Sequence, residues 1–270
     1  MTWVRFATAI VIAPPVLVAV FVLAPQLFAI MVGVVILLGA WEWSRLAGLD
    51  ARRLRGVFVG GVAAALWAVW WIPEPIKMAI LLLGVAWWGV AFSLVIGYPQ
   101  TLETWRGPWR KLISGWLVLI PAWTGMVVLK GHPEADVLLA ILLFLIWGAD
   151  VGAYFAGRKF GRTKLAPNVS PGKSWQGVWG GIALGLICAV AIGFYTGLSG
   201  SEAWIGLLVT CFVTMAASVL GDLYESVIKR QSGYKDSGNL LPGHGGIMDR
   251  IDSLTAAAPL FALCVMAGAF

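Results

Sequence analysis

The sequence predicts an all-α integral membrane protein with about nine transmembrane helices. Hydrophobic residues make up 60% of the 270 residues, charged residues make up 12%, and the mean hydropathy is +0.88. A soluble domain of this length carries roughly a quarter charged residues. A soluble fold cannot bury so much apolar surface, so the lipid bilayer must be the solvent for most of the chain. Two further observations, the lengths of the apolar runs and the placement of the basic residues, support this class.

Apolar runs of about 17–25 residues, the length that crosses the hydrocarbon of a bilayer, recur along the whole chain. The first run follows Arg5, contains Pro14 and Pro15, and has no convincing cleavage site for an export signal. We therefore expect it to be retained as a kinked first helix. The predicted spans are 6–23, 26–44, 57–72, 77–97, 114–129, 136–157, 175–197, 203–226 and 252–269.

The basic residues test this count of helices. Nine spans place the amino terminus and the loops after the second, fourth, sixth and eighth helices on one face. All 19 lysines and arginines except Lys77 and Lys130 fall on that face. The excess of positive charge marks the cytoplasmic side of a membrane protein. The sequence therefore predicts a cytoplasmic amino terminus and a carboxyl terminus outside.

No stretch is polar enough to form a second, soluble domain, so residues 1–270 are predicted to form a single polytopic membrane domain. Residues 1–135 contribute helices of low specificity, whereas residues 136–270 carry most of the candidate chemistry. We detect no internal repeat of the kind found in many secondary transporters. A transporter that relays protons through carboxylates is the alternative from another functional class, and the absence of a repeat argues against it.

Six carboxylates lie within or beside the predicted cytoplasmic ends of helices, where burying a charge is costly and each charge tends to face a partner, water or a cation. Each of them alone is also explained by an ion pair that holds two helices together. Their convergence on one face favours a functional site. These residues are Glu42, Asp150, Asp222, Glu225, Asp249 and Asp252.

The last two helices offer the best candidates for metal ligands. Asp222, Glu225 and Ser226 share one helical face, because residues three and four apart are neighbours on a helix. Asp249 and Asp252 have the same relation at the start of the ninth helix. Oxygen ligands suit Mg²⁺. We predict that Asp222 and Asp249 hold it, with Glu225 and Asp252 as further candidate ligands.

The loop between these two helices carries glycines next to basic and acidic residues. Glycine lets backbone N–H groups approach an oxyanion closely. Basic side chains together with carboxylates are what a metal-bound polyphosphate needs. The candidate binding residues in this region are Ser226, Lys229, Arg230, Lys235, Asp236, Gly245, Gly246 and Arg250.

The segment from Ser226 to Asp252 contains Lys-Arg, then Lys-Asp, then His-Gly-Gly-x-x-Asp-Arg-x-Asp, and it resembles the hallmark segment of the phosphatidate cytidylyltransferases, also called CDP-diacylglycerol synthases. The stretches from Asp150 to Gly161 and from Ser170 to Gly177 resemble two further motifs of that family. Together these motifs cover roughly residues 147–252. One departure is Gln176, which stands where the family usually has Glu.

The resemblance implies a nucleotidyltransferase that makes CDP-diacylglycerol and pyrophosphate from CTP and phosphatidate for phospholipid biosynthesis. It also implies Mg²⁺, with K⁺ as a candidate second cation. The expected catalytic residues are Lys173, Asp222, Asp249 and His244, with Asp150, Ser170 and Lys173 among the binding residues. The expected partners are CTP, phosphatidate and membrane lipid, with no nucleic acid, and a homodimer is left open. The expected location is the bacterial inner membrane, with the active site facing the cytoplasm.

Alternatives remain open at two places. His244 orients a phosphate or shuttles a proton if it is functional, and only supports the loop if it is structural. Ser170 to Lys173 forms either a turn that caps a helix or, through Lys173 at a helix amino terminus, a phosphate site. The rival enzymes use CTP on another lipid, as a polyprenol kinase or an archaeal-type CDP-lipid synthase does.

Overall fold

The computed structural model of the chain describes residues 14–105, 107–241, 243 and 245–270. Almost all of this part is helical, and residues 14–21 form a first short helical stretch. The one sheet in the described residues has two short antiparallel strands. The elements are α2 (Pro25–Leu46), α3 (Arg52–Trp71), α4 (Glu74–Ile96), the 3-10 helix η1 (Gln100–Trp105), α5 (Pro108–Lys130), α6 (Ala135–Phe160), β1 (Lys164–Ala166), β2 (Ser170–Ser174), α7 (Trp175–Tyr195), α8 (Ser201–Gln231) and α9 (Met248–Met266).

The structure confirms an all-α integral membrane protein. Within the described residues, the 7 helices from α2 to α8 are long and apolar enough to cross a membrane, and they correspond to the second to eighth predicted spans. Helix α9 overlaps the ninth predicted span but is not one of these 7 helices, and its first five residues include Asp249, Arg250 and Asp252. The first predicted span lies partly outside the described residues. The total of nine spans and the orientation of the termini stay predictions.

Several predicted helices were too short. Helix α3 begins at Arg52 instead of residue 57, α5 begins at Pro108 instead of residue 114, and α8 continues to Gln231 instead of ending at residue 226. The predicted limits followed the apolar residues alone. A helix continues beyond the hydrocarbon where its lysine and arginine side chains reach the polar interface, so the added turns are charged.

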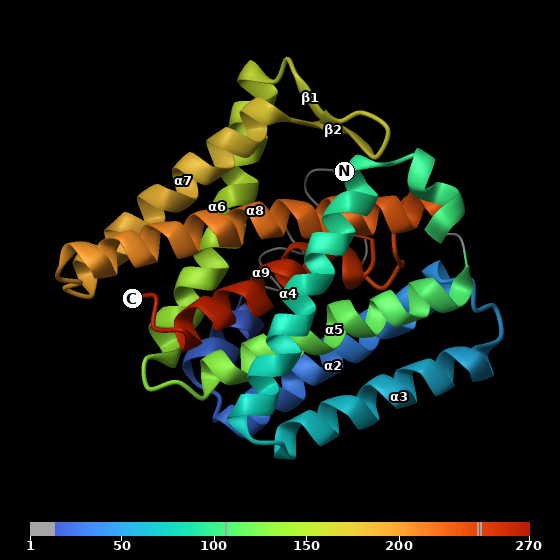
Figure 1. Cartoon of the computed structure of the whole chain (residues 1–270), viewed down its shortest axis with the longest axis horizontal. Helices are drawn as coiled ribbons and strands as arrows, with labels where there is room; N and C mark the ends of the chain where they lie inside the picture. Colours follow the sequence, from blue (N-terminus) through green and yellow to red (C-terminus); the bar gives the residue numbers. More distant parts are fainter. Residues whose placement is uncertain (1–13, 106, 242, 244) are drawn as a thin grey trace.

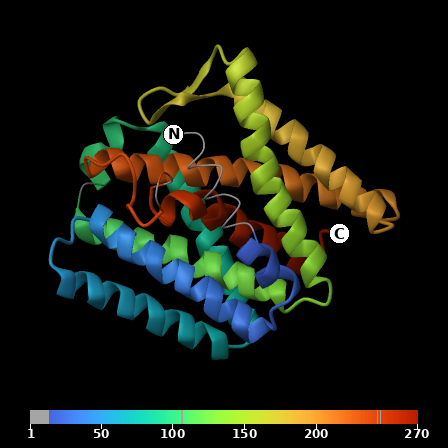
Figure 2. The same cartoon turned by 180° about the vertical axis from the view of Figure 1, so that it is seen from behind.

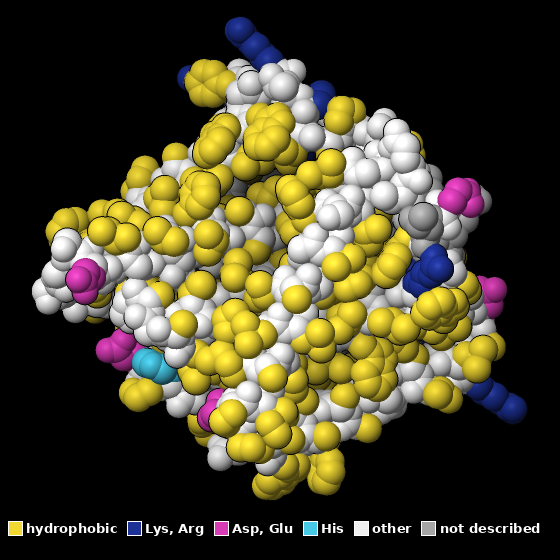
Figure 3. Space-filling model, in the orientation of Figure 1, with side chains coloured by type: hydrophobic (Ala, Val, Ile, Leu, Met, Phe, Trp, Pro, Cys, Tyr) yellow, Lys and Arg dark blue, Asp and Glu magenta, His cyan; other side chains and the backbone are white. Residues whose placement is uncertain are grey.

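The loops alternate between two edges of the molecule, as the charge pattern requires. Figure 1 shows the loops after α2, α4, α6 and α8 along the upper and right-hand edges, and the loops after α3, α5 and α7 along the lower and left-hand edges. The space-filling view shows lysine and arginine side chains at the upper and right-hand edges, with a broad apolar surface between the two edges (Figure 3). The chemistry predicted from the loops therefore lies at one edge.

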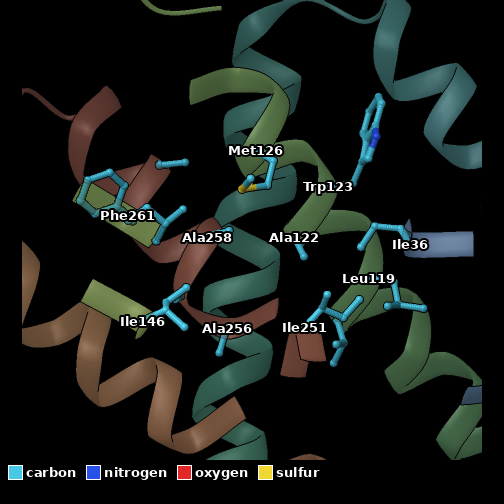
Figure 4. Close-up of a cluster of buried hydrophobic side chains, with 14 of the residues drawn as sticks. Ile36, Leu119, Ala122, Trp123, Met126, Ile146, Ile251, Ala256, Ala258 and Phe261 are labelled. Carbon is cyan, nitrogen blue, oxygen red and sulfur yellow. The ribbon is translucent and has the colours of Figure 1, made fainter. Parts of the chain in front are cut away.

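Helix α5 lies at the centre of the bundle and packs against α2, α4 and α9. Its side chains Leu119, Ala122 and Met126 are almost fully buried, as are Ala256, Ala258 and Phe261 on α9. Figure 4 shows these side chains meeting in one apolar cluster with Ile36 of α2 and Ile146 of α6. Because α9 is held by this cluster, the position of its charged first turn is fixed by the core.

Helices α6 and α7 pack closely against each other, away from α2 and α3 (Figures 1 and 2). Their contact depends on missing side chains. A Cβ atom added at Gly152 would lie 2.5 Å from the carbonyl oxygen of Gly180 and 2.9 Å from the Cα atom of Gly181. Small residues let membrane helices approach this closely, and van der Waals packing then holds them together. The pair forms one wall of the cavity described below.

We expect Gly152→Ala to lower the melting temperature of the purified protein in detergent, because overpacking a closely fitted interface costs about 1–3 kcal/mol. The matched control is Gly89→Ala on α4, where an added Cβ would meet no atom within 4 Å. Thermal unfolding of both variants, followed by intrinsic fluorescence, measures the difference. Equal melting temperatures for the two variants would contradict the packing described for α6 and α7.

The chain between α6 and α7 forms a hairpin, in which Lys164 pairs with Ser174 and Ala166 pairs with Ser170. The hydroxyl of Ser174 accepts a hydrogen bond of 3.2 Å from the backbone N–H of Gly177 and so caps the amino terminus of α7. Residues 170–173 therefore lie in strand β2 and do not form the predicted capping turn, because Ser174 caps the helix. A phosphate site at Lys173 stays a prediction. The small sheet was not predicted.

Candidate active site

A cavity of about 410 Å³ lies between α6, α7, β2 and α8, with Ser253 of α9 at its edge. Its charged lining comes from Asp150, Arg158, Lys173 and Asp222. Met215, two helical turns deeper on α8, belongs to its apolar lining. The cavity therefore has charges near the loops and apolar walls deeper among the helices.

Lys173 and Asp222 form an ion pair inside this cavity. The ammonium group of Lys173 on β2 donates a hydrogen bond to Oδ2 of Asp222 on α8. The side chains are 29% and 28% exposed, so both remain accessible from the cavity. The hydroxyl of Ser226 lies 3.5 Å from Oδ1 of Asp222, at the limit of a hydrogen bond. The hairpin thus brings together Lys173 and Asp222, two of the predicted site residues.

Two further carboxylates surround Asp222. Asp150 of α6 and Asp252 of α9 both interact electrostatically with it. The approach of α9 is close, because a Cβ atom added at Gly221 would lie 2.4 Å from the backbone oxygen of Asp252. Lys173 also interacts with Asp150 and Asp252. Three carboxylates therefore share the positive charge of Lys173, and this arrangement attracts a cation.

A second charged cluster lies beside the first and is more deeply buried. The ammonium group of Lys229 donates to Oε2 of Glu225 at 2.5 Å and to Oδ1 of Asp249 at 2.6 Å. The side chains of Glu225 and Asp249 are 1% and 7% exposed. Separating such a buried pair leaves an uncompensated charge, which is strongly destabilising. Lys229 therefore holds the end of α8 against the start of α9.

Asp249 also organises the loop that precedes α9. Its Oδ2 atom accepts hydrogen bonds from the backbone N–H of Ser237 at 2.9 Å, from the hydroxyl of Ser237 at 2.9 Å and from the backbone N–H of Gly246 at 2.8 Å. Gly245 has a φ of +82°, and a Cβ atom there would lie 2.6 Å from the same oxygen. Glycine is required at this position by both the backbone conformation and the lack of space.

The oxygen donors suit Mg²⁺, but Asp222 and Asp249 belong to different clusters, so a Mg²⁺ ion held by both stays a prediction. No group of three or more His, Cys, Asp or Glu side chains in the described part of the chain is arranged to hold a metal. Mg²⁺ usually keeps several waters and binds one or two carboxylates plus substrate phosphates. An ionised carboxylate has about four acceptor positions. The contacts above occupy part of those on Asp222 and leave one on Oδ1 of Asp249.

The other predicted binding residues are spread around the two clusters. Arg230 donates from Nε to the backbone oxygen of Val169 at 3.4 Å, which links α8 to the hairpin. Arg250 is exposed and interacts electrostatically with Asp150. Lys235 and Asp236 are exposed in the loop between α8 and α9, and Ser170 lies in β2. His244 lies outside the described residues.

Gln176 has a structural position. Its side-chain oxygen accepts hydrogen bonds from the backbone N–H groups of Arg162 at 3.1 Å and Thr163 at 3.2 Å. Its amide group donates to the hydroxyl of Thr163 at 3.3 Å. These contacts tie the start of α7 to the turn before β1, so Gln176 supports the hairpin that carries Lys173.

Sequence reasoning missed three residues that line the cavity or hold the loop. Tyr154 and Arg158 line the cavity, and Arg158 donates from Nη1 to the hydroxyl of Tyr154 at 3.0 Å. Ser237, which is fully buried, contacts Asp249. The motif around Asp150 contains the first two residues, but their role was not assigned. No signal in the sequence distinguished Ser237 from the other serines of the loop.

Comparisons with known proteins show the family of this chain. The sequence model described as "Cytidylyltransferase family" matches residues 3–267. A protein of Pseudomonas aeruginosa named "Phosphatidate cytidylyltransferase" is 48% identical over 97% of this chain and 96% of its own length. A protein of Haemophilus influenzae with the same name is 42% identical over 95% of this chain and 96% of its own length. One of Bacillus subtilis is 44% identical over 43% of this chain and 42% of its own length.

Proposed function

We propose that this chain, which belongs to the cytidylyltransferase family and is a nucleotidyltransferase, transfers CMP from CTP to phosphatidate and releases pyrophosphate. The product of this reaction is CDP-diacylglycerol. The near full-length similarity to proteins named for phosphatidate supports this choice of lipid. The observation that carries the proposal is the cavity in which Lys173 and Asp222 meet, with charges near the loops and apolar walls deeper in the bundle.

Both substrates are anionic, so their mutual repulsion is the first obstacle to the reaction. An oxygen of the lipid phosphate attacks the α-phosphorus of CTP, a new P–O bond forms, and the bond to the departing pyrophosphate breaks. Lys173, Arg230 and Lys235 bind phosphate oxygens and orient the two reactants for attack. Lys229 is enclosed between Glu225 and Asp249, so its part is to hold Asp249 in place.

Mg²⁺, held by Asp222 and Asp249, would neutralise phosphate charge and align the attack. Glu225 and Asp252 stay candidate ligands, and K⁺ stays the candidate for a second cation. No protein nucleophile is required. The remaining task of this chain is to exclude competing water from the cavity and to keep the two phosphates in line.

The position of the site supports a cytoplasmic active site in a bacterial cell membrane. CTP is a cytosolic nucleotide, and the site lies at the edge that carries nearly all basic side chains (Figures 1 and 3). Lipid reaches the apolar part of the cavity from the bilayer. A homodimer stays part of the proposal as an assembly of two such sites.

Labelled CTP tests the proposal against a CTP-dependent lipid kinase. The purified protein is incubated with phosphatidate, Mg²⁺ and CTP labelled in either the α- or the γ-phosphate. We expect the α-label to enter the lipid fraction and the γ-label to leave as pyrophosphate. Entry of the γ-label into lipid would overturn nucleotidyl transfer. Replacing phosphatidate by a polyprenol or by the phosphate of an archaeal-type ether lipid is the substrate control, and we expect it to give at most a few per cent of the rate.

A further inference from the structure

Glu42 is a buried carboxylate on α2 that contacts the loop and helix carrying Asp249. It is 3% exposed and lies in the last turns of its helix. It accepts a hydrogen bond at 2.8 Å from the backbone N–H of Met248 and one at 3.1 Å from that of Ile247. The third contact, at 2.9 Å, is with the hydroxyl of Ser237, whose single proton is shared between Glu42 and Asp249. Three donors separated from it by about two hundred residues of sequence therefore converge on one side chain.

Two of these contacts lie at the start of α9. The N-cap residue of α9 is Ile247, whose side chain makes no capping hydrogen bond. The first N–H groups of a helix lack partners within the helix, and its amino terminus carries partial positive charge. Glu42 supplies an acceptor and a negative charge from another helix. It therefore fixes the direction in which the first turn of α9, and Asp249 within it, leaves the loop.

The third contact connects Glu42 to Asp249 directly. The hydroxyl oxygen of Ser237 lies 2.9 Å from Oε2 of Glu42 and 2.9 Å from Oδ2 of Asp249. The backbone is shaped around this arrangement. A Cβ atom added at Gly238 would lie 2.0 Å from Oε1 of Glu42, and one at Gly246 would lie 2.3 Å from Oε2. Any displacement of Glu42 is therefore transmitted to the loop and to Asp249.

Neighbouring side chains from the same half of the chain hold this loop as well. Arg45 donates from Nη2 to the backbone oxygens of Ser237 and Asp236, and its guanidinium group lies 4.7 Å from the ring centre of Tyr234. Lys111 of α5 is 5% exposed and donates to the hydroxyl of Ser232 at 2.8 Å. Glu42, Arg45 and Lys111, all from residues 1–135, thus hold the loop between α8 and α9 in the other half of the chain.

We propose that Glu42 is a positioning residue for nucleotidyl transfer, acting through Ser237 and the first turn of α9 to set the orientation of Asp249. This inference rests on the proposed function and adds to it a residue outside the motifs that resemble the family. Glu42 does not line the cavity. Glu42 acts on the reaction through the loop, because the contacts of its carboxylate are with Ser237 in the loop and with the start of α9.

The first test is kinetic. In Glu42→Gln an amide N–H₂ replaces one of the accepting oxygens and faces donors, so we expect kcat to fall about tenfold or more while the KM for CTP stays within about threefold. Gly238→Ala, which displaces the Glu42 side chain without removing it, is expected to reproduce this result. Ser237→Ala combined with Glu42→Gln is expected to cost less than the sum of the two single effects, because both residues act on Asp249 and share one contact.

The matched control is Glu74→Gln, which removes a carboxylate at the opposite edge, where Glu74 pairs with Lys77 at 2.8 Å. We expect unchanged kinetics for this variant. If the fall in kcat of the double variant equalled the product of the falls in Glu42→Gln and Ser237→Ala, the proposal would be overturned. A fall in activity that only matches a fall in the folded fraction, measured by thermal unfolding in detergent, would also overturn it, since Glu42 would then be merely structural.

The second test does not depend on the reaction. Lys235 is exposed in the loop that Glu42 holds. Trypsin should cleave after Lys235 several-fold faster in Glu42→Gln and in Gly238→Ala than in the unchanged protein or in Glu74→Gln, as measured by mass spectrometry of the fragments over time. Unchanged cleavage would overturn the proposal even if activity were lost. If the labelling experiment failed while cleavage accelerated, the proposed function would fail and the link between Glu42 and the loop would stand.

Discussion

Replacing Asp249 by Asn should lower CMP transfer by about 100-fold or more in a protein that remains folded. The change removes the negative charge next to Lys229, whose ammonium group lies 2.6 Å from Oδ1 of Asp249. The ammonium group of Lys229 keeps Glu225 as a partner at 2.5 Å in this variant. A 100-fold loss in rate corresponds to about 2.7 kcal/mol of lost transition-state stabilisation, since every 1.36 kcal/mol in a barrier is tenfold in rate. The variant also loses a proposed Mg²⁺ ligand.

The measurement is release of pyrophosphate by purified protein with phosphatidate, CTP and Mg²⁺. Asp136→Asn is the control, because Asp136 is an exposed carboxylate at the opposite edge that pairs with Lys130 at 3.5 Å. We expect it to keep full activity. Size-exclusion elution and thermal unfolding establish that both variants are folded. Near-normal turnover in Asp249→Asn would remove Asp249 from the proposed site.

Replacing Lys173 by Ala should raise the KM for CTP or lower kcat by about tenfold or more. Lys173 is the cation that contacts Asp222 inside the cavity, and it also interacts with Asp150 and Asp252. Without it, Asp222 loses the ammonium group that pairs with it, and its negative charge repels an anionic substrate. A hydrogen bond to a charged group is worth about 1.5–3 kcal/mol, which corresponds to roughly ten- to a hundredfold.

Lys164→Ala is the matched control, since Lys164 lies in the same hairpin, is exposed and does not line the cavity. Initial rates over a range of CTP concentrations separate kcat from KM. We expect Lys164→Ala to differ from the unchanged protein by less than about twofold. If Lys173→Ala and Lys164→Ala had equal kinetics, residues 170–173 would have only a structural role, as the segment that leads into α7.

The helices and their order could be predicted because apolar length is a strong signal. A run such as 77–97 admits only a membrane helix, and α4 is found at Glu74–Ile96. The ends of helices could not be placed as well, because charged residues such as Arg52 and Arg53 extend a helix past the hydrocarbon. The hairpin of β1 and β2 was missed because its strands have 3 and 5 residues, too few for an alternating pattern to show.

Candidate site residues could be chosen from the sequence, whereas the contacts between them could not. The helical spacing of Asp222 with Glu225 and of Asp249 with Asp252 indicated which carboxylates share a face. It could not show that Lys173 and Lys229 divide those carboxylates into two clusters, because the pairing of Lys173 depends on the hairpin. Glu42 was recognised as a carboxylate at a helix end, but the loop that it holds lies about two hundred residues away.

Three glycines of the α6–α7 contact also border the cavity between α6, α7, β2 and α8. Gly157, Gly177 and Gly181 line it, and a Cβ atom at Gly181 would lie 2.5 Å from the backbone oxygen of Ala149. The absence of side chains at these glycines therefore has two effects. It lets α6 and α7 pack closely, and it leaves the cavity beside them unfilled. A bulkier residue at any of these three would disturb helix association and substrate accommodation in a single step. Gly152 is buried in the same seam but does not border the cavity, so it is the position at which stability alone responds.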